Sequence, residues 1–198
     1  MALKLITSAS ALAVSLVEAK AHLRVDTSDD DTLITAMITA ATEAAEQATG
    51  RAIMPQTLEL AQDEFTYAMV LTRVPVASIT SIKYIDLDGA EQTLSGAAYT
   101  IDNADDFGPA CVAPVYDTEW PDTRDQINAV KVRYVAGYAN AAAVPESIKA
   151  WIKLQVGAMY ENRESEVVDR GSVLSLGFAD RLLDRYLVVG KRRKVMEK

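Results

Sequence analysis

The chain has 198 residues, 49 % of them hydrophobic, which is enough to bury a substantial core in one large domain or two small ones. Its formal net charge is −8, yet the last eight residues, KRRKVMEK, hold five basic and one acidic side chain. The acidic body disfavours general nucleic-acid binding, and no apolar run approaches the length of a membrane span. A single cysteine, Cys111, excludes an internal disulfide and fits folding in a reducing compartment.

The N-terminal quarter predicts two helices after an extended arm of weak structure at residues 1–14. The first helix should start at Ser15, because Ser15 and Glu18 have the spacing of a capping box. The second is expected over Ser28–Arg51, with Ser28 and Asp31 capping its start and Gly50 in the left-handed C-terminal position. Joined by a short connection, the two helices are expected to form an antiparallel hairpin.

The second half of the long helix has an apolar face made mostly of alanine. Small residues let another backbone approach closely, so this face predicts tight packing against further helices. The members of interest are Ala41, Ala45 and Ala48.

Short alternating segments follow and predict a mostly antiparallel β module. Asp88-Gly89 is the strongest turn signal and predicts a tight hairpin. The segment 69–72 is expected to pair with 57–60. The predicted strands are 57–60, 69–72, 78–86, 91–94, 99–102, 110–113 and 130–136.

Helix is expected again from Pro145, and a last helix at about Gly177–Val188. The predicted fold class is α+β: a helical bundle core, built from the N- and C-terminal helix pairs, with an inserted, mostly antiparallel β module. The predicted divisions are an N-terminal arm and helical hairpin (1–52), the β insertion (53–140), the C-terminal helices (141–190) and a basic tail (191–198).

No constellation of residues predicts catalysis, a cofactor or a metal. His22 is the only histidine, and no serine or cysteine has a base to activate it. Asp29, Asp30 and Asp31 point in different directions around a helix start. The segment DNADD at 102–106 lacks the central glycine and terminal glutamate of a calcium loop. The sequence therefore predicts that the chain is not an enzyme.

Three segments, taken in order, resemble the head–tail connector (adaptor) proteins of tailed bacteriophages, including the neck adaptors of gene transfer agents. They are residues 18–51, 120–138 (WPDTRDQINAVKVRYVAGY) and 144–164 (VPESIKAWIKLQVGAMYENRE). In that family an acidic helix start, a Leu-Ile pair and a closing Thr-Gly-Arg mark the long helix. They match Asp29–Asp31, Leu33–Ile34 and Thr49–Arg51 here.

The resemblance implies a structural virion protein that forms a ring, typically of twelve copies, below the portal. Such a ring extends the DNA channel, lets double-stranded DNA pass during ejection without specific binding, and joins the capsid to the next neck or stopper protein. By analogy the tail residues Lys191, Arg192, Arg193 and Lys194 are candidates for portal contact. Ala41, Ala45 and Ala48 are candidates for subunit contact. The implied location is the neck of a phage or phage-like particle assembled in the host bacterial cytoplasm, with no membrane partner.

Two alternatives remain open at this stage. The basic tail fits a DNA-binding or packaging accessory protein, whose binding would be sensitive to salt. The second alternative, a hydrolase or other enzyme, is disfavoured because the sequence lacks a base–nucleophile pair.

Overall fold

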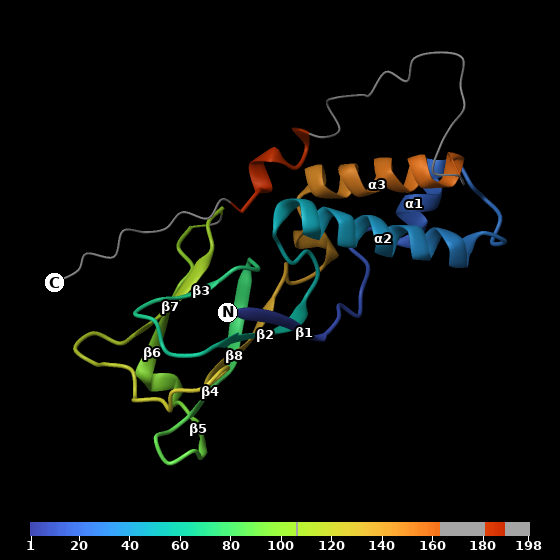
Figure 1. Ribbon diagram of the computed structural model, residues 1–198. Coiled ribbons are helices and arrows are strands. Elements are labelled where there is room, and N and C mark those ends of the chain that lie inside the picture. The colour runs from blue at the N-terminus through green and yellow to red at the C-terminus, as the bar shows by residue number, and fades with distance from the viewer. Residues whose placement is uncertain (106, 163–180, 189–198) are drawn as a thin grey trace, which may run out of the picture.

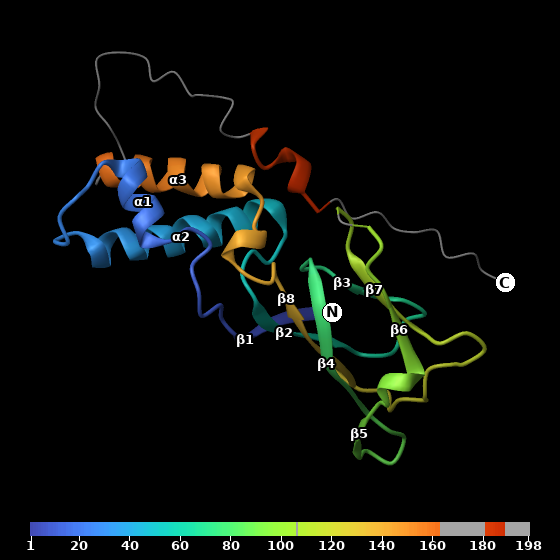
Figure 2. The same ribbon diagram turned by 180° about the vertical axis from the view of Figure 1, so that it is seen from behind.

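Helices and sheets occupy opposite ends of the molecule. The computed structural model describes residues 1–105, 107–162 and 181–188. In these residues three α-helices lie at one end, and eight β-strands in two antiparallel sheets form the other (Figure 1). The view from behind shows the same separation (Figure 2). None of the helices in the described ranges is long and apolar enough to cross a bilayer.

The helices are α1 (Leu16–Leu23), α2 (Asp31–Thr49) and α3 (Glu146–Glu161), and short 3₁₀ turns cover Gly96–Ala98, Ala141–Ala143 and Asp184–Tyr186. The strands are β1 (Ala2–Thr7), β2 (Gln56–Gln62), β3 (Met69–Leu71), β4 (Val76–Ile85), β5 (Glu91–Thr93), β6 (Tyr99–Asp102), β7 (Ala110–Pro114) and β8 (Val130–Ala136). One sheet has the order β1-β2-β8-β4-β5, and the other has the order β3-β7-β6.

Strand β8 is the centre of the larger sheet and pairs with β2 on one side and β4 on the other. Its alternation is the reason: Val130, Val132, Tyr134 and Ala136 are buried, while the residues between them are half-buried. This is the strand that the sequence pattern predicted, with the same bounds.

Two separate apolar clusters form the core. One joins the helices, through residues such as Ile38 of α2 and Ile152 of α3. The other lies between the sheets, where Met69 and Val112 of the smaller sheet pack in the same cluster as Val132 of β8. Each end of the molecule therefore buries its own apolar side chains.

The predicted helical-bundle core is wrong, although the α+β class holds. The described residues contain three α-helices rather than four. Of the predicted final helix Gly177–Val188, residues 177–180 lie outside the described ranges. In the described part Arg181 is helical, residues 182–183 form a turn and Asp184–Tyr186 form a 3₁₀ segment. The backbone there is bonded elsewhere: Tyr186 O accepts from the Arg51 side chain, and Val188 N–H donates to Thr49 O. An α-helix running through Val188 would pair the Val188 N–H with Asp184 O, but Asp184 O accepts from the Leu187 N–H instead.

The predicted N-terminal arm is a strand. β1 runs antiparallel to β2, with Leu3 opposite Leu60 and Leu5 opposite Leu58. The predicted pairing of 57–60 with 69–72 is wrong as well, because β2 lies between β1 and β8 while β3 pairs with β7. Strand pairing is set by contacts between distant residues, which local alternation does not encode.

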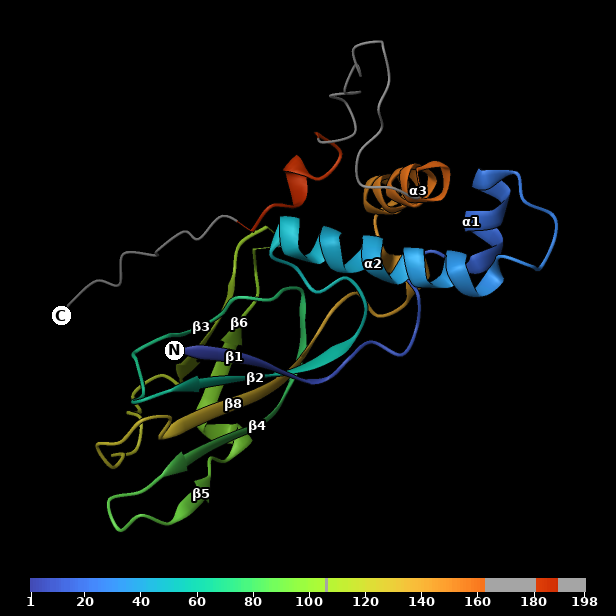
Figure 3. The same ribbon diagram turned by 45° about the vertical axis from the view of Figure 1, so that its right-hand side comes forward.

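The predicted antiparallel hairpin of α1 and α2 is also not formed. Figure 3 shows α1 lying across α2 and α3 rather than alongside them. His22 of α1 meets α3 at Gly157, where an added Cβ would lie 3.6 Å from the His22 Nε2 atom. This is an ordinary van der Waals distance, so α1 packs directly against α3 at this position.

Two of the predicted helix caps are confirmed. Ser15 Oγ accepts from the Glu18 N–H at 3.2 Å, and Glu18 Oε2 accepts from the Ser15 N–H at 2.8 Å. The Ser15 N–H and the Ser15 hydroxyl both donate to Glu18 Oε2, and these two hydrogen bonds lower the pKa of Glu18 from its ordinary value. At the end of α2, Gly50 is left-handed with φ 73°, and its N–H donates to Glu46 O at 2.9 Å.

The predicted Ser28 cap on α2 is wrong. The helix begins at Asp31 with Asp30 as its N-cap, and no side chain caps it by a hydrogen bond. The aspartates bond to the other helices instead: Tyr160 Oη donates to Asp30 Oδ2 at 2.6 Å, and Lys20 Nζ bonds Asp31 Oδ1 at 2.6 Å. The acidic start of α2 therefore ties it to α1 and α3.

Gly137 directly follows β8, where the chain leaves the sheet, and replacing it tests whether this backbone position tolerates a side chain. Its φ is +126°, and a Cβ there would overlap the carbonyl group of Met54. We expect Gly137→Ala to lower the free energy of unfolding by roughly 3 kcal/mol, from backbone strain and the clash together. Denaturant titration measures this. Gly96→Ala is the matched control, since its Cβ would meet only the Tyr99 hydroxyl at 4.0 Å. Equal losses in both variants would contradict this account.

Candidate functional site

The described residues offer no chemical centre, so the candidate functional features are a buried junction and the surfaces around it. Within residues 1–105, 107–162 and 181–188, no group of three His, Cys, Asp or Glu side chains is placed to hold a metal ion. His22 lies on α1 against α3, and Cys111 lies on β7 in a half-buried position.

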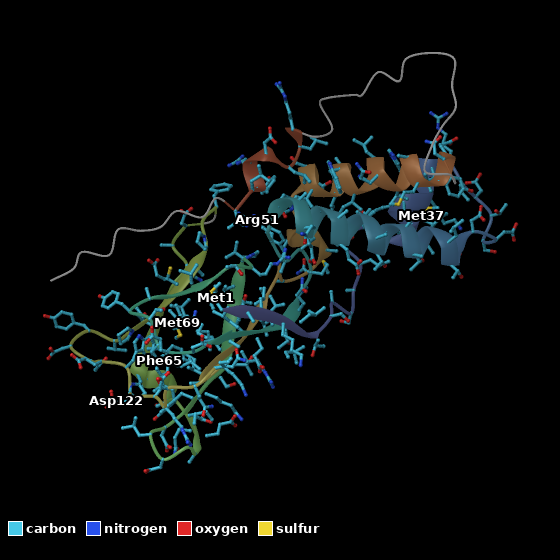
Figure 4. All side chains as sticks on the ribbon, in the orientation of Figure 1. Met1, Met37, Arg51, Phe65, Met69 and Asp122 are labelled. Atoms are coloured by element: carbon cyan, nitrogen blue, oxygen red, sulfur yellow. The ribbon has the colours of Figure 1, made fainter. Side chains whose placement is uncertain are left out.

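Arg51 lies where α2 ends, between the helices and the strands (Figure 4). It is only 2 % exposed. Its Nε donates to the backbone carbonyl of Tyr186 at 2.7 Å. The guanidinium carbon lies 5.9 Å from the ring centroid of Phe107 and 6.0 Å from that of Tyr186. An arginine buried to this degree is stable only because hydrogen-bond acceptors and aromatic faces surround its charge.

A second layer of polar contacts connects the end of α2 to the strands. Arg73 Nη1 donates to Glu46 O at 2.7 Å and to Arg51 O at 3.1 Å. Glu46 Oε1 accepts from the Ile53 N–H at 2.7 Å and from Gln56 Nε2 at 2.8 Å. Arg73, in the loop between β3 and β4, thus supplies a further donor to a carbonyl at the end of α2, where the helix itself has few donors left. We call this set of contacts around Arg51 and Glu46 the arginine junction.

A groove of about 560 Å³ lies between β1 and α2. Leu3 and Leu5 of β1 and Leu58 of β2 give it an apolar side, while Glu43 and Gln47 of α2 give it a polar one. All six residues of β1 are exposed, and β1 is an edge of its sheet. An exposed edge strand presents backbone donors and acceptors to another chain. Sequence reasoning missed this surface because residues 1–14 were not predicted as a strand.

Comparisons with known proteins agree with the sequence resemblance. Residues 13–84 match the model of a family described as phage gp6-like head-tail connector protein. The chain is similar in fold to one in the "neck of empty GTA particle computed with C6 symmetry", with a TM-score of 0.78 and 21 % identity over 100 % of this chain and 99 % of that one. No curated protein sequence matches it.

The resemblance to phage head–tail connectors is confirmed. Two further similar structures are titled "virion of native gene transfer agent (GTA) particle" (TM-score 0.77, 21 % identity) and "neck of native GTA particle computed with C12 symmetry" (TM-score 0.75, 20 % identity). Each alignment covers 100 % of this chain and 99 % of the other. The family match contains the first segment quoted from the sequence, 18–51, whereas the likeness of 120–138 and 144–164 is supported by the fold.

The candidate subunit-contact residues of this connector-like chain differ in burial. Ala41 and Ala45 belong to the helical apolar cluster and are 2 % and 0 % exposed, whereas Ala48 is exposed. Their role between subunits stays a prediction. The candidate portal-contact residues, Lys191 to Lys194, lie outside the described residues, and their role stays a prediction too.

The arginine junction gives a paired test. We expect Arg51→Ala to lower the free energy of unfolding by roughly 2–4 kcal/mol, because it leaves the Tyr186 carbonyl and the neighbouring rings without their partner. Arg185→Ala is the control: its guanidinium lies 5.4 Å from the same Phe107 ring but the side chain is exposed, so about 0.5 kcal/mol is expected. Denaturant unfolding of both variants compares the losses, and a loss below 1 kcal/mol for Arg51→Ala would refute the assigned role.

Proposed function

We propose that this protein is a structural head–tail connector that assembles as a ring, of about twelve copies, below a portal and joins the capsid to the next neck or stopper protein. The observation that carries this proposal is the full-length fold similarity to chains in GTA necks. The match of residues 13–84 to the connector family supports it from the sequence. The role is mechanical, with no catalytic step.

The charge of the chain supports passage of DNA through such a ring. The net charge is −8, and the 190 residues before the basic tail are more acidic still. Like charge between the channel wall and the phosphates prevents tight binding, so double-stranded DNA can move through without sticking. In this proposal DNA is a passing substrate of the particle and not a specific ligand.

The basic tail is the proposed portal contact. Lys191, Arg192, Arg193 and Lys194 form a compact cationic run that suits an acidic protein surface. Residues 181–188 end two residues before the tail; Tyr186 O accepts from Arg51 in the arginine junction, and the Val188 N–H donates to Thr49 O of α2. Residue 188 is therefore held against the body of the chain.

A ring with cyclic symmetry needs two different surfaces of the chain to meet, one from each neighbour. We propose that the exposed side of α2 around Ala48 is one of them. The exposed edge of β1 is close to α2 across the groove and offers further contact area. Ala41 and Ala45 are less informative test positions, since substitutions there would first disturb the helical core of the protomer.

Replacement at Ala48 tests the ring. We expect Ala48→Arg to abolish oligomers formed with the portal, measured by sedimentation, while the melting temperature changes little, because the side chain is exposed. Ala36→Arg is the matched control on α2, exposed and about 120° around the helix axis from Ala48. Normal assembly of the Ala48→Arg chain would remove this helix face from the interface.

Particles made without the protein test the connector role itself. We expect DNA-filled heads without tails in electron micrographs, and the same defect, in part, from a chain lacking residues 191–198. Tailed particles in normal yield would contradict the proposal. If the shortened chain instead assembles normally but loses a salt-sensitive DNA mobility shift shown by the full chain, the DNA-binding accessory alternative takes its place.

A further inference from the structure

Three loops meet at the end of the sheets farthest from the helices. Gln62 at the end of β2 and Tyr84 near the end of β4 both pair with Val130 at the start of β8. The loops 63–68, 86–90 and 115–128 therefore leave the sheets on the same side. We call these three loops the distal tip. Figure 4 labels Phe65 and Asp122 at this end, and Met37 at the helical end.

The distal tip is held together by its own contacts. The rings of Phe65 and Trp120 are stacked, with centroids 4.8 Å apart. Trp120 Nε1 donates to Thr66 O at 2.8 Å, which ties loop 115–128 to loop 63–68. The Arg124 N–H donates to Ile85 O at 3.0 Å, which ties the same loop to the end of β4. The surface of the tip is thus formed before any partner arrives.

The tip exposes large apolar side chains that the fold itself leaves uncovered. Tyr67 is 68 % exposed, Leu87 66 %, Tyr116 96 % and Ile127 80 %. All three loops contribute. Large apolar side chains that stay exposed on loops held in place by their own contacts favour a protein–protein contact, with aromatic residues as anchors.

The surroundings of these side chains are acidic. The three loops contain eight aspartates and glutamates and a single basic residue, Arg124. Asp86 accepts hydrogen bonds from the Gln92 side chain and the Ala90 N–H, and both lower its pKa, so it stays charged. A partner must therefore carry positive charge around an apolar centre. DNA is repelled by this surface, and a second distal tip would meet it with like charge.

We propose that the distal tip binds a basic protein surface on another component of the particle, one whose lysines and arginines surround an apolar patch. This inference rests on the proposed connector function. It adds a second attachment surface, at the end of the molecule opposite the helices. The four exposed apolar side chains supply the contact area, and the acidic rim selects the partner and orients it.

Site-specific crosslinking in assembled particles tests the tip. Tyr116 of the full-length chain is replaced by the photoreactive p-benzoylphenylalanine, which is close in shape, and purified particles are irradiated and analysed by mass spectrometry. The expected product joins position 116 to a lysine- or arginine-rich segment of a different particle protein. The same group at Val17, which is 77 % exposed on α1, is the control and should not reach that segment.

A variant with fewer acidic side chains at the tip tests whether their charge, and not proximity alone, determines the crosslink. Combining Glu119→Gln, Asp122→Asn and Asp125→Asn with the crosslinker should lower the yield of that product about tenfold, because the rim no longer attracts the basic partner. These side chains are exposed, so folding should be unaffected.

The outcomes distinguish this inference from the connector proposal. If the chain is present in particles but position 116 crosslinks only to other copies of itself, to an acidic segment, to DNA or to nothing, the tip inference fails and the connector role stands. An unchanged yield in the charge variant overturns the basic-partner assignment. If the chain is absent from particles, both proposals fail together.

Discussion

A buried arginine at the end of a helix is the contact on which the arrangement of this protein depends. Arg51 bonds the backbone of Tyr186 and lies against two aromatic rings, while Arg73 reaches back to the carbonyls of Glu46 and Arg51. Leaving a buried guanidinium without partners costs several kcal/mol, so α2, the first residues of the β part and residues 181–188 are held together at one point. The two apolar clusters, one in each half, are joined there.

The arginine junction lies between two ends of the molecule, and the proposed connector can bind a different neighbour with each end. Residues 181–188 lie beside the junction, and the distal tip lies at the far end of the sheets (Figure 1). One end is cationic in sequence and the other is acidic with exposed apolar side chains. A protein that links two different neighbours needs such unlike surfaces, because each then selects its own partner.

Local patterns in the sequence predicted most elements but not their arrangement. Features that depend on neighbouring residues could be predicted: the alternation in β8, the Asp88-Gly89 hairpin, the Ser15–Glu18 capping box and the Gly50 cap. Features that depend on distant residues could not be predicted: the pairing of β3 with β7, the crossing of α1 and the strand β1. The arginine junction could not be found either: Arg51 follows Gly50 as an ordinary exposed residue would, and its partners Phe107 and Tyr186 are far away in the sequence. The bundle prediction failed because the described residues hold three α-helices, and the segment before Val188 forms a 3₁₀ turn whose end bonds to Thr49 of α2.

The proposed role requires that the chain forms a ring in the neck of a tailed particle. Cryo-electron microscopy of particles containing this protein, with the neck reconstructed without imposed symmetry, tests it most directly. We expect about twelve copies of this fold in a ring between portal and stopper, with the channel open through the centre. Density for this fold elsewhere in the particle, or as isolated copies that form no ring, would contradict it.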